Sequence, residues 1–303
     1  MKLDVISVID FGESLEDIID SAQRLKKGAL KGSEPLKGKT LAMIFEKAST
    51  RTRVSFEVAM TQLGGHAIFL SPKDIQIGRG ETISDTAKVL SRMVDCIMYR
   101  AFKHDIMLEL ANNASVPVIS ALDELEHPCQ TVADLMTIKE QKGRFKGLKL
   151  AYVGDGSNVC NSLMLGSAMV GMNFMAACPE GYEPDAKLFK QAEKIAKKMG
   201  CLIKVVEDPT EAASKADILY TDTWVSMGME AETMERERIF KPYQLNSELL
   251  KKAKKDCMVL HCLPAHRGLE ITDEVMDGPS SFIFDQSENR LHTEKAILLT
   301  LIH

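Results

Sequence analysis

The chain has no hydrophobic run long enough to cross a membrane. None of its 303 residues belongs to an apolar stretch near the roughly 20 residues that a transmembrane helix needs. The first residues, 1–4, carry neither the basic region nor the apolar core of a signal peptide. A net charge of -5 also gives no overall attraction for nucleic acid or anionic lipid. We therefore expect a cytoplasmic protein that binds neither a membrane nor nucleic acid, in which any anion site is locally basic.

Paired cysteines are absent as well. The seven cysteines are an odd number and form no CxxC pair. Such usage is not typical of a disulfide framework, and several of these cysteines lie in apolar, strand-like runs. We predict that they are reduced thiols.

The sequence does contain a regular alternation of strand-like and helical segments. Strand-like runs are predicted at 40–45, 67–70, 96–99, 116–120, 148–153, 173–177, 202–206, 218–221, 258–260 and 282–284. Helical patterns separate them, among them 15–27 and 186–199, and a final helix is expected at 291–302. This alternation predicts an α/β fold in which mainly parallel sheets are flanked by helices on both faces. A polar, glycine-containing connection at 139–147 places a domain boundary near 143.

Residues 49–53 (Ser-Thr-Arg-Thr-Arg) lie between the strand predicted at 40–45 and a helical pattern at 54–63. Free backbone amides at a helix start, together with two guanidinium groups, favour a phosphate there. A capping Ser or Thr followed by solvated arginines is the alternative for this segment alone.

Polar side chains follow further predicted strands of the first half. Arg100 ends the strand-like run that begins near Cys96, and residues 127–130 (His-Pro-Cys-Gln) follow the strand near Val118. Ligands bind at the carboxyl ends of parallel strands, where His127 could donate a hydrogen bond to a carbonyl oxygen. A proline in a first helical turn beside a structural histidine explains the same residues, and solvent is an alternative environment for Arg100.

Residues 154–158 (Gly-Asp-Gly-Ser-Asn) resemble the start of a dinucleotide-binding fingerprint. The third glycine is missing, since Val159 stands in its place, while Glu180 lies near the position of a ribose-binding acid. An NAD site and a glycine-lined loop that presents Asn158 as an amide ligand are both consistent with these residues.

Two polar segments follow later strands. Asp222 precedes Ser226-Met227-Gly228, which suits recognition of an ammonium group by a closing loop but also fits an ordinary surface loop. Residues 261–268 (His-Cys-Leu-Pro-Ala-His-Arg-Gly) suggest a metal site. Because zinc sites use spaced ligand pairs and no second cluster is evident, we predict no metal.

In this order and at these separations, the S-T-R-T-R, H-P-C-Q, D-x-x-x-S-M-G and H-C-L-P motifs resemble those of the transcarbamoylases, and of their ornithine type in particular. The resemblance covers essentially the whole chain. It implies two doubly wound domains with the active site in the cleft between them. Residues 1–142 would bind carbamoyl phosphate and 143–287 would bind ornithine, while a helix at 288–303 would pack back on the first domain.

The resemblance also implies roles for individual residues. The carbamoyl phosphate ligands would be Ser49, Thr50, Arg51, Thr52, Gln76, Arg100, His127, Pro128, Cys129, Gln130, Cys262, Leu263 and Arg290. Gln76 would act across a subunit contact. The ornithine ligands would be Asn158, Asp222, Ser226 and Met227. Arg100, His127 and Cys262 would be catalytic, with Cys262 assisting or orienting the attacking amine.

The implied reaction is direct attack of the δ-amine of L-ornithine on carbamoyl phosphate, giving L-citrulline and phosphate without a cofactor. A homotrimer or a larger assembly of trimers, acting in arginine metabolism, is implied in the same way. The alternatives are a transcarbamoylase for another amine, such as putrescine or acetylornithine, and an NAD-dependent oxidoreductase built on residues 154–158.

Overall fold

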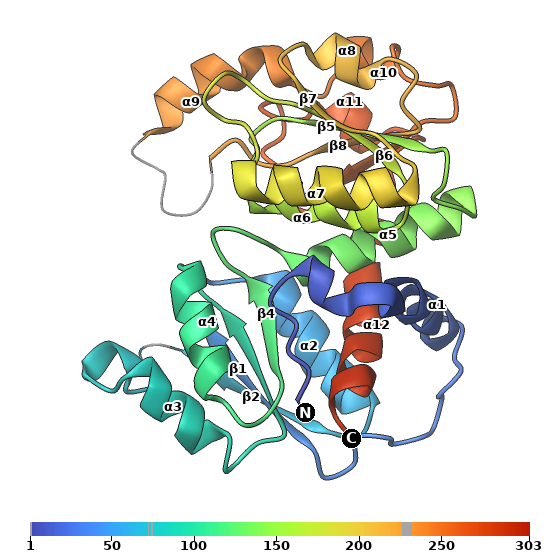
Figure 1. The fold of residues 1–303 in the computed structure, drawn as a ribbon. Coiled ribbons are helices and arrows are strands. Elements are labelled where there is room, and N and C mark those ends of the chain that lie inside the picture. The colour runs from blue at the N-terminus through green and yellow to red at the C-terminus, as the bar shows by residue number, and fades with distance from the viewer. Residues whose placement is uncertain (1, 72, 74, 226–231) are drawn as a thin grey trace. The chain divides into compact units, whose positions relative to one another are not determined.

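The computed structural model describes residues 2–71, 73, 75–225 and 232–303 (Figure 1). Contacts divide the chain into unit 1, which comprises Met1–Met136 and Glu288–His303, and unit 2, which comprises Thr137–Ser287. The division falls inside helix α5 (Pro128–Lys142), whereas the sequence places the boundary at the end of that helix.

Unit 1 contains a sheet of parallel strands in the order β2-β1-β3-β4. Its strands are β1 (Thr40–Phe45), β2 (His66–Leu70), β3 (Cys96–Arg100) and β4 (Val118–Leu122). Its helices are η1 (Val8–Ser14), α1 (Leu15–Lys26), α2 (Thr50–Gln62), η2 (Ile77–Arg79), α3 (Ile83–Leu90), α4 (His104–Asn113), the start of α5 and most of α12 (Ile283–Leu301). In Figure 1, α3 and α4 lie on one side of this sheet and α2 and α12 on the other.

Alternating side chains of the central strands explain this layering. Ala42 and Ile44 of β1 and Ile97 and Tyr99 of β3 point to one face, where they form a buried cluster with apolar residues of α3 and α4. Because these strands are covered on both faces, their sequences are continuous apolar runs.

Unit 2 contains a second parallel sheet, in the order β7-β6-β5-β8-β9. Its strands are β5 (Lys149–Val153), β6 (Asn173–Ala177), β7 (Ile203–Val206), β8 (Ile218–Thr221) and β9 (Met258–His261). Its helices are α6 (Asn158–Met169), α7 (Ala186–Met199), α8 (Pro209–Ala213), α9 (Thr233–Phe240), η4 (Lys241–Tyr243), α10 (Ser247–Leu250) and α11 (Asp273–Met276). The two parallel sheets flanked by helices confirm the predicted α/β fold class.

One predicted strand is wrong. Residues 282–284 are not a strand, because α12 begins at Ile283 and continues to Leu301. The chain touches β9 only briefly before this helix: the amide of Val259 donates to Ser280, and the amide of Phe282 donates to Val259. A short apolar run fits either a strand or a buried helix, which accounts for the error.

In both sheets the strand order reverses beside the first strand of the unit. In unit 1 the reversal lies between β1 and β3, and in unit 2 it lies between β5 and β8. Ligands of open α/β sheets bind at the carboxyl ends of the strands at such a switch point. The predicted ligands Ser49, Thr50, Arg51, Thr52, Arg100, Asn158 and Asp222 lie at or just after the carboxyl ends of β1, β3, β5 and β8.

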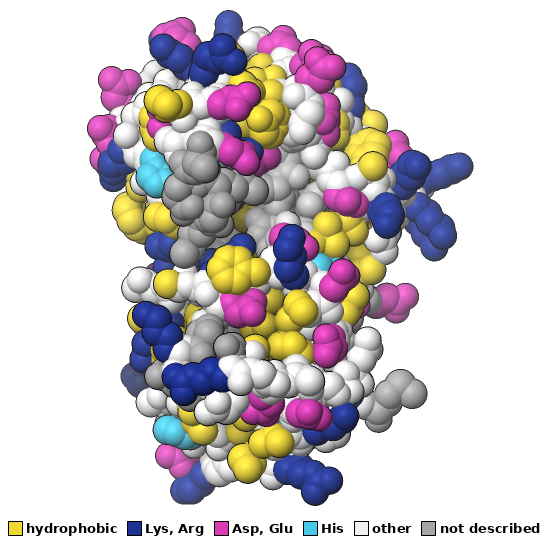
Figure 2. Space-filling model, turned by 90° about the vertical axis from the view of Figure 1, so that its left-hand side faces the viewer, with side chains coloured by type: hydrophobic (Ala, Val, Ile, Leu, Met, Phe, Trp, Pro, Cys, Tyr) yellow, Lys and Arg dark blue, Asp and Glu magenta, His cyan; other side chains and the backbone are white. Residues whose placement is uncertain are grey.

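On the face drawn in Figure 2, basic and acidic side chains are interspersed among apolar ones. None of the described helices combines the length and the apolar character that a membrane span needs.

Candidate active site

Ser49 forms the N-cap of α2, at the carboxyl end of β1. It has an extended backbone, and its hydroxyl accepts a hydrogen bond from the Thr52 amide at 3.2 Å. The two arginines of the motif differ. The Nε atom of Arg53 donates to Glu57 at 2.9 Å, and the Arg53 guanidinium stacks 3.8 Å from the centroid of the Phe69 ring. These contacts occupy Arg53, and Arg51 stays the predicted anion ligand of this motif.

Burial and the positive charges of three arginines of unit 1 lower the pKa of His127. His127 is buried just before α5, and burial together with the positive charges of Arg290, Arg100 and Arg51 holds its pKa well below the usual value. The imidazole is therefore neutral at physiological pH and keeps one N–H donor. The three arginines come from α12, the end of β3 and α2, so the fold assembles predicted ligands that are far apart in sequence.

Arg290 connects α12 to two other predicted ligands. Its Nη1 donates to the side-chain oxygen of Gln130 at 2.9 Å, and its Nη2 donates to the Thr52 hydroxyl at 3.2 Å. The amide nitrogen of Gln130 in turn donates to Asp134 at 2.8 Å. These contacts place Thr52, Gln130 and Arg290 in one buried network.

The remaining predicted residues of unit 1 differ in their surroundings. Pro128 begins α5, and the thiol of Cys129 contacts the Ser120 carbonyl oxygen at 3.5 Å. Burial raises the pKa of Cys129 to about 12, so this thiol is neutral. Thr50 is exposed at the first position of α2. Gln76 is exposed just before η2, and its expected role across a subunit contact stays a prediction.

In unit 2, Asp222 and Cys262 meet at the carboxyl ends of the neighbouring strands β8 and β9. The Cys262 thiol donates to Asp222 Oδ1 at 2.8 Å, and the Thr223 amide donates to the same oxygen at 2.7 Å. Burial raises the pKa of Asp222, while His261 and the hydrogen bond from Cys262 act in the opposite direction. A buried carboxylate with few neutralising partners suits an ammonium ligand.

His261, Cys262 and Asp222 also have the composition of a metal site, because their ligand atoms lie within 4.8 Å of one another. Asp222 joins this cluster from the end of β8, which its position in the sequence does not indicate. Both ring nitrogens of His261 are already used within the protein. Nδ1 accepts from the Leu263 amide at 2.9 Å, and Nε2 lies 3.1 Å from Glu270 Oε1. The histidine is thus held as a hydrogen-bonded support for the segment that carries Cys262 and Leu263, which has a left-handed φ of 58°.

The loop after β5 does not have the open backbone of a dinucleotide site. The Gly156 amide donates to the Tyr182 carbonyl oxygen at 2.8 Å, and a Cβ at Gly156 would collide with the backbone of Glu183 and Pro184. The second glycine of a dinucleotide fingerprint lets the backbone approach a pyrophosphate. Here the close approach is made by residues 182–184, so the glycine is required by internal packing. Asn158 begins α6 beside this loop and is half-buried.

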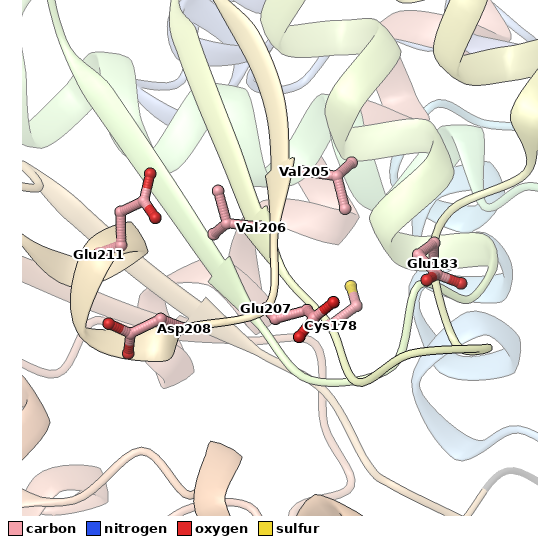
Figure 3. Close-up of a pocket in the computed structure, with 7 residues that line it drawn as sticks. All are labelled: Cys178, Glu183, Val205, Val206, Glu207, Asp208 and Glu211. Atoms are coloured by element: carbon pink, nitrogen blue, oxygen red, sulfur yellow. The ribbon is translucent and has the colours of Figure 1, made fainter.

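An acidic pocket in unit 2 also disfavours an anionic cofactor. Figure 3 shows Glu207 and Asp208 just beyond β7, with Glu211 on α8 and Glu183 nearby, and Cys178, Val205 and Val206 complete the lining. Carboxylates at this edge repel phosphate groups. Asn158 and Asp222, the predicted ornithine ligands within the described residues, do not line the pocket.

Two predicted ornithine ligands, Ser226 and Met227, lie outside the described residues. Glu294, whose buried carboxylate accepts from Arg290, is not among the predicted site residues. Its spacing of four residues after Arg290 on one helix allows such a pair but does not show that the pair is buried. The buried ion pair of Asp155 with Arg236, which supports the loop after β5, is not among the predicted features either.

Two family models match successive parts of the chain. Residues 4–140 match the family model described as aspartate/ornithine carbamoyltransferase, carbamoyl-P binding domain, and residues 146–301 match the Asp/Orn binding domain of the same family. The chain belongs to the aspartate/ornithine carbamoyltransferase family.

Individual members of this family are similar along the full length. The chain is 57% identical over 303 residues to an ornithine carbamoyltransferase of Picrophilus torridus, with 100% of both chains covered. It is 53% identical to a catabolic ornithine carbamoyltransferase of Thermoplasma volcanium, with 99% of each covered. Among solved structures, the ornithine carbamoyltransferase of Pyrococcus furiosus gives a TM-score of 0.95 at 51% identity, covering 100% of this chain and 98% of that one.

Proposed function

We propose that this chain is an ornithine carbamoyltransferase, which moves the carbamoyl group of carbamoyl phosphate to the δ-amine of L-ornithine and releases L-citrulline and phosphate. Unit 1 binds carbamoyl phosphate and unit 2 binds ornithine. The observation that carries the proposal is the buried network of Arg290 with Gln130 and with Thr52 in the first turn of α2, close to a His127 that burial and positive charges keep neutral. Full-length relatives named for this activity support it.

The residues of unit 1 suit the charge that develops in this reaction. Attack by an amine places negative charge on the carbonyl oxygen, and departure of phosphate places charge on the leaving oxygens. A neutral His127 donates a hydrogen bond to the carbonyl oxygen and does not transfer its proton. Arg51, Arg100 and the amides of the first turn of α2 hold the phosphate. No covalent enzyme intermediate is needed, because the amine itself is the nucleophile.

The residues of unit 2 suit the acceptor. The Asp222 carboxylate attracts the α-ammonium group of ornithine, and Asn158 is an amide ligand for the same end of the molecule. The δ-amine must lose a proton before it attacks, since an unperturbed alkylamine has a pKa of about 10.4. We propose that the Cys262 thiol, which donates to Asp222, orients this amine. We propose Ser226 and Met227 as further ornithine ligands by their motif positions, and Leu263 as a ligand of carbamoyl phosphate.

We also propose that the enzyme is cytoplasmic and assembles as a homotrimer or a larger assembly of trimers, in arginine metabolism. Exposed apolar side chains on unit 1, such as those of Val54, Ile68 and Phe102, are available for subunit contacts. An exposed Gln76 is compatible with a role at the site of a neighbouring subunit. Light scattering after size exclusion measures the assembly directly, and a monomeric mass would contradict it.

The test of the activity is a colorimetric assay for ureido products with carbamoyl phosphate and a panel of amines. We expect product with L-ornithine and little or none with putrescine, acetylornithine or aspartate. Preference for putrescine or acetylornithine would keep the chemistry but reassign the acceptor. An enzyme that makes no product with any of these amines would contradict the proposal.

A further inference from the structure

Glu294 lies one turn after Arg290 on α12, and its side chain is fully buried. Its Oε1 atom accepts two hydrogen bonds from the same guanidinium, from Nε at 3.0 Å and from Nη2 at 2.6 Å. Two bonds from one guanidinium to one carboxylate restrict both the position and the rotation of the arginine. A buried carboxylate is also costly unless it is paired, so its presence needs an explanation.

The orientation set by Glu294 decides where the other donors of Arg290 point. Nη1 reaches Gln130 and the second N–H of Nη2 reaches Thr52. With the two bonds to Glu294, these contacts use four of the five N–H groups that a guanidinium carries. The fifth, on Nη1, has no partner among the described residues.

These contacts in turn fix the hydrogen-bonding roles of Thr52 and Gln130. The Thr52 hydroxyl accepts from Arg290, so its own proton is directed to a different acceptor. The side-chain oxygen of Gln130 has two lone pairs, one of which accepts from Arg290 and one of which can accept from an NH2 group. A donor hydroxyl and an acceptor oxygen, beside one N–H of Arg290, match the carbonyl oxygen and the NH2 group of a carbamoyl ligand.

We propose that Glu294 is a positioning residue, which holds the Arg290 guanidinium in the orientation that presents Thr52 and Gln130 to carbamoyl phosphate. The inference rests on the proposed function, because it assumes that this network binds the carbamoyl donor. Glu294 itself makes no contact with the substrate in this scheme.

The charges around Glu294 make its role dependent on pH. Burial raises the pKa of Glu294 to about 7, against the opposing effect of Arg290. The groups that face this pair are Ser55 of α2, Cys129 and Asp134 of α5, and His127 before α5. The pKa of Cys129 is about 12 and that of His127 lies well below its usual value, so neither changes charge between pH 6 and 8. Glu294 becomes protonated in this range, which weakens its hold on Arg290 at the acidic end.

The test compares Glu294→Gln with wild type by the KM for carbamoyl phosphate at saturating ornithine, at pH 8 and at pH 6. Glutamine keeps the size and one acceptor oxygen but removes the charge. We expect a KM about tenfold higher at pH 8, as for a weakened hydrogen bond to a charged group. At pH 6 the ratio of the variant KM to the wild-type KM is expected to fall to about twofold, because wild-type Glu294 is then largely protonated. The KM for ornithine should stay within about twofold at both pH values, as its predicted ligands lie in unit 2.

Glu288→Gln is the matched control. Glu288 lies on the same helix, its carboxylate is 3.3 Å from His292 one turn later, and its side chain is 56% exposed. The same chemical change there should leave the KM for carbamoyl phosphate unchanged. A second variant, Glu294→Met, removes the acceptor altogether and should raise this KM further at pH 8. Thermal melting of each variant shows that it is folded.

Two results would overturn the positioning role: a ratio of variant to wild-type KM near one at pH 8, or a raised KM with the same ratio at pH 6 and pH 8. The second result would indicate a loss of packing, because packing does not depend on the charge of Glu294. Calorimetric titration with carbamoyl phosphate alone separates this role from the proposed function. If no citrulline forms but binding of carbamoyl phosphate shows the pH-dependent difference, the function fails and the positioning role stands. If citrulline forms and binding shows no difference, the positioning role fails and the function stands.

Discussion

Replacing Arg290 with glutamine removes the residue of α12 that binds Thr52, Gln130 and Glu294. Its side chain is 3% exposed and makes four hydrogen bonds to these three partners. Glutamine is shorter and neutral, so it cannot span the same partners. We expect Arg290→Gln to affect both catalysis and stability, and the structure separates the two effects.

The catalytic loss follows from the donors that disappear. Removing one donor aimed at a developing charge typically costs about 3–4 kcal/mol, or roughly 100- to 1000-fold. We therefore expect kcat/KM for carbamoyl phosphate to fall by at least about 100-fold. The KM for ornithine should change little, because Asp222 and Cys262 lie in unit 2.

The loss of stability should be smaller than the usual cost of breaking a buried ion pair, about 3–5 kcal/mol. The pKa of Glu294 is already about 7 with the arginine present. Without Arg290 the pKa rises further, so the carboxyl group becomes protonated at neutral pH rather than remaining as a buried charge. The remaining cost is that of an uncharged buried polar group, about 1–3 kcal/mol.

Urea denaturation at pH 7 measures this free energy, and steady-state kinetics measure kcat/KM. The double variant Arg290→Gln with Glu294→Gln should recover part of the stability and none of the activity. A single variant that keeps kcat/KM for carbamoyl phosphate within threefold of wild type would refute the role given to Arg290.

Three further predictions concern other parts of the molecule. Gly156→Ala should destabilise the fold by about 3 kcal/mol in urea denaturation, since the new methyl group meets the Pro184 backbone; wild-type stability would show that the loop has room for a ligand. Cys262→Ala removes the donor to Asp222 and should raise the KM for ornithine about tenfold, and that for carbamoyl phosphate by less; equal effects on both would contradict a main role at ornithine. The pKa of Glu294 is raised from 4.5 to about 7, so its contribution to stability is present below pH 4.5 and is lost as the pH rises through 7. The unfolding free energy of wild type should therefore fall between pH 5 and pH 8 by up to about 3 kcal/mol more than that of Glu294→Gln, and parallel pH profiles would count against this pKa.

The sequence predicts those parts of the fold in which a local pattern is compatible with only one secondary structure. The runs at 40–45, 173–177 and 218–221 are strands with these bounds, because buried central strands of parallel sheets are continuously apolar. The run at 282–284 is also apolar, but it belongs to α12. Three apolar residues do not distinguish a strand from the buried start of a helix.

The candidate site shows the same limit. Ser49 is recognisable as a helix cap because its role depends on the next three residues. The contact of Asp222 with Cys262 depends on β8 and β9 being neighbours, and 40 residues separate the pair in the chain. Glu294 is harder still. A glutamate in a helix normally faces solvent, and only the packing of α12 in unit 1 shows that this one is buried against Arg290.

The most direct measurement follows the carbon atom that is transferred. Carbamoyl phosphate labelled with ¹³C at the carbonyl carbon is mixed with enzyme and L-ornithine, and the label is followed by NMR while phosphate is quantified. We predict that the label appears in the ureido group of citrulline, with one phosphate released for each citrulline formed. Label appearing only as bicarbonate or cyanate at the uncatalysed rate, with no citrulline, would contradict carbamoyl transfer by this protein.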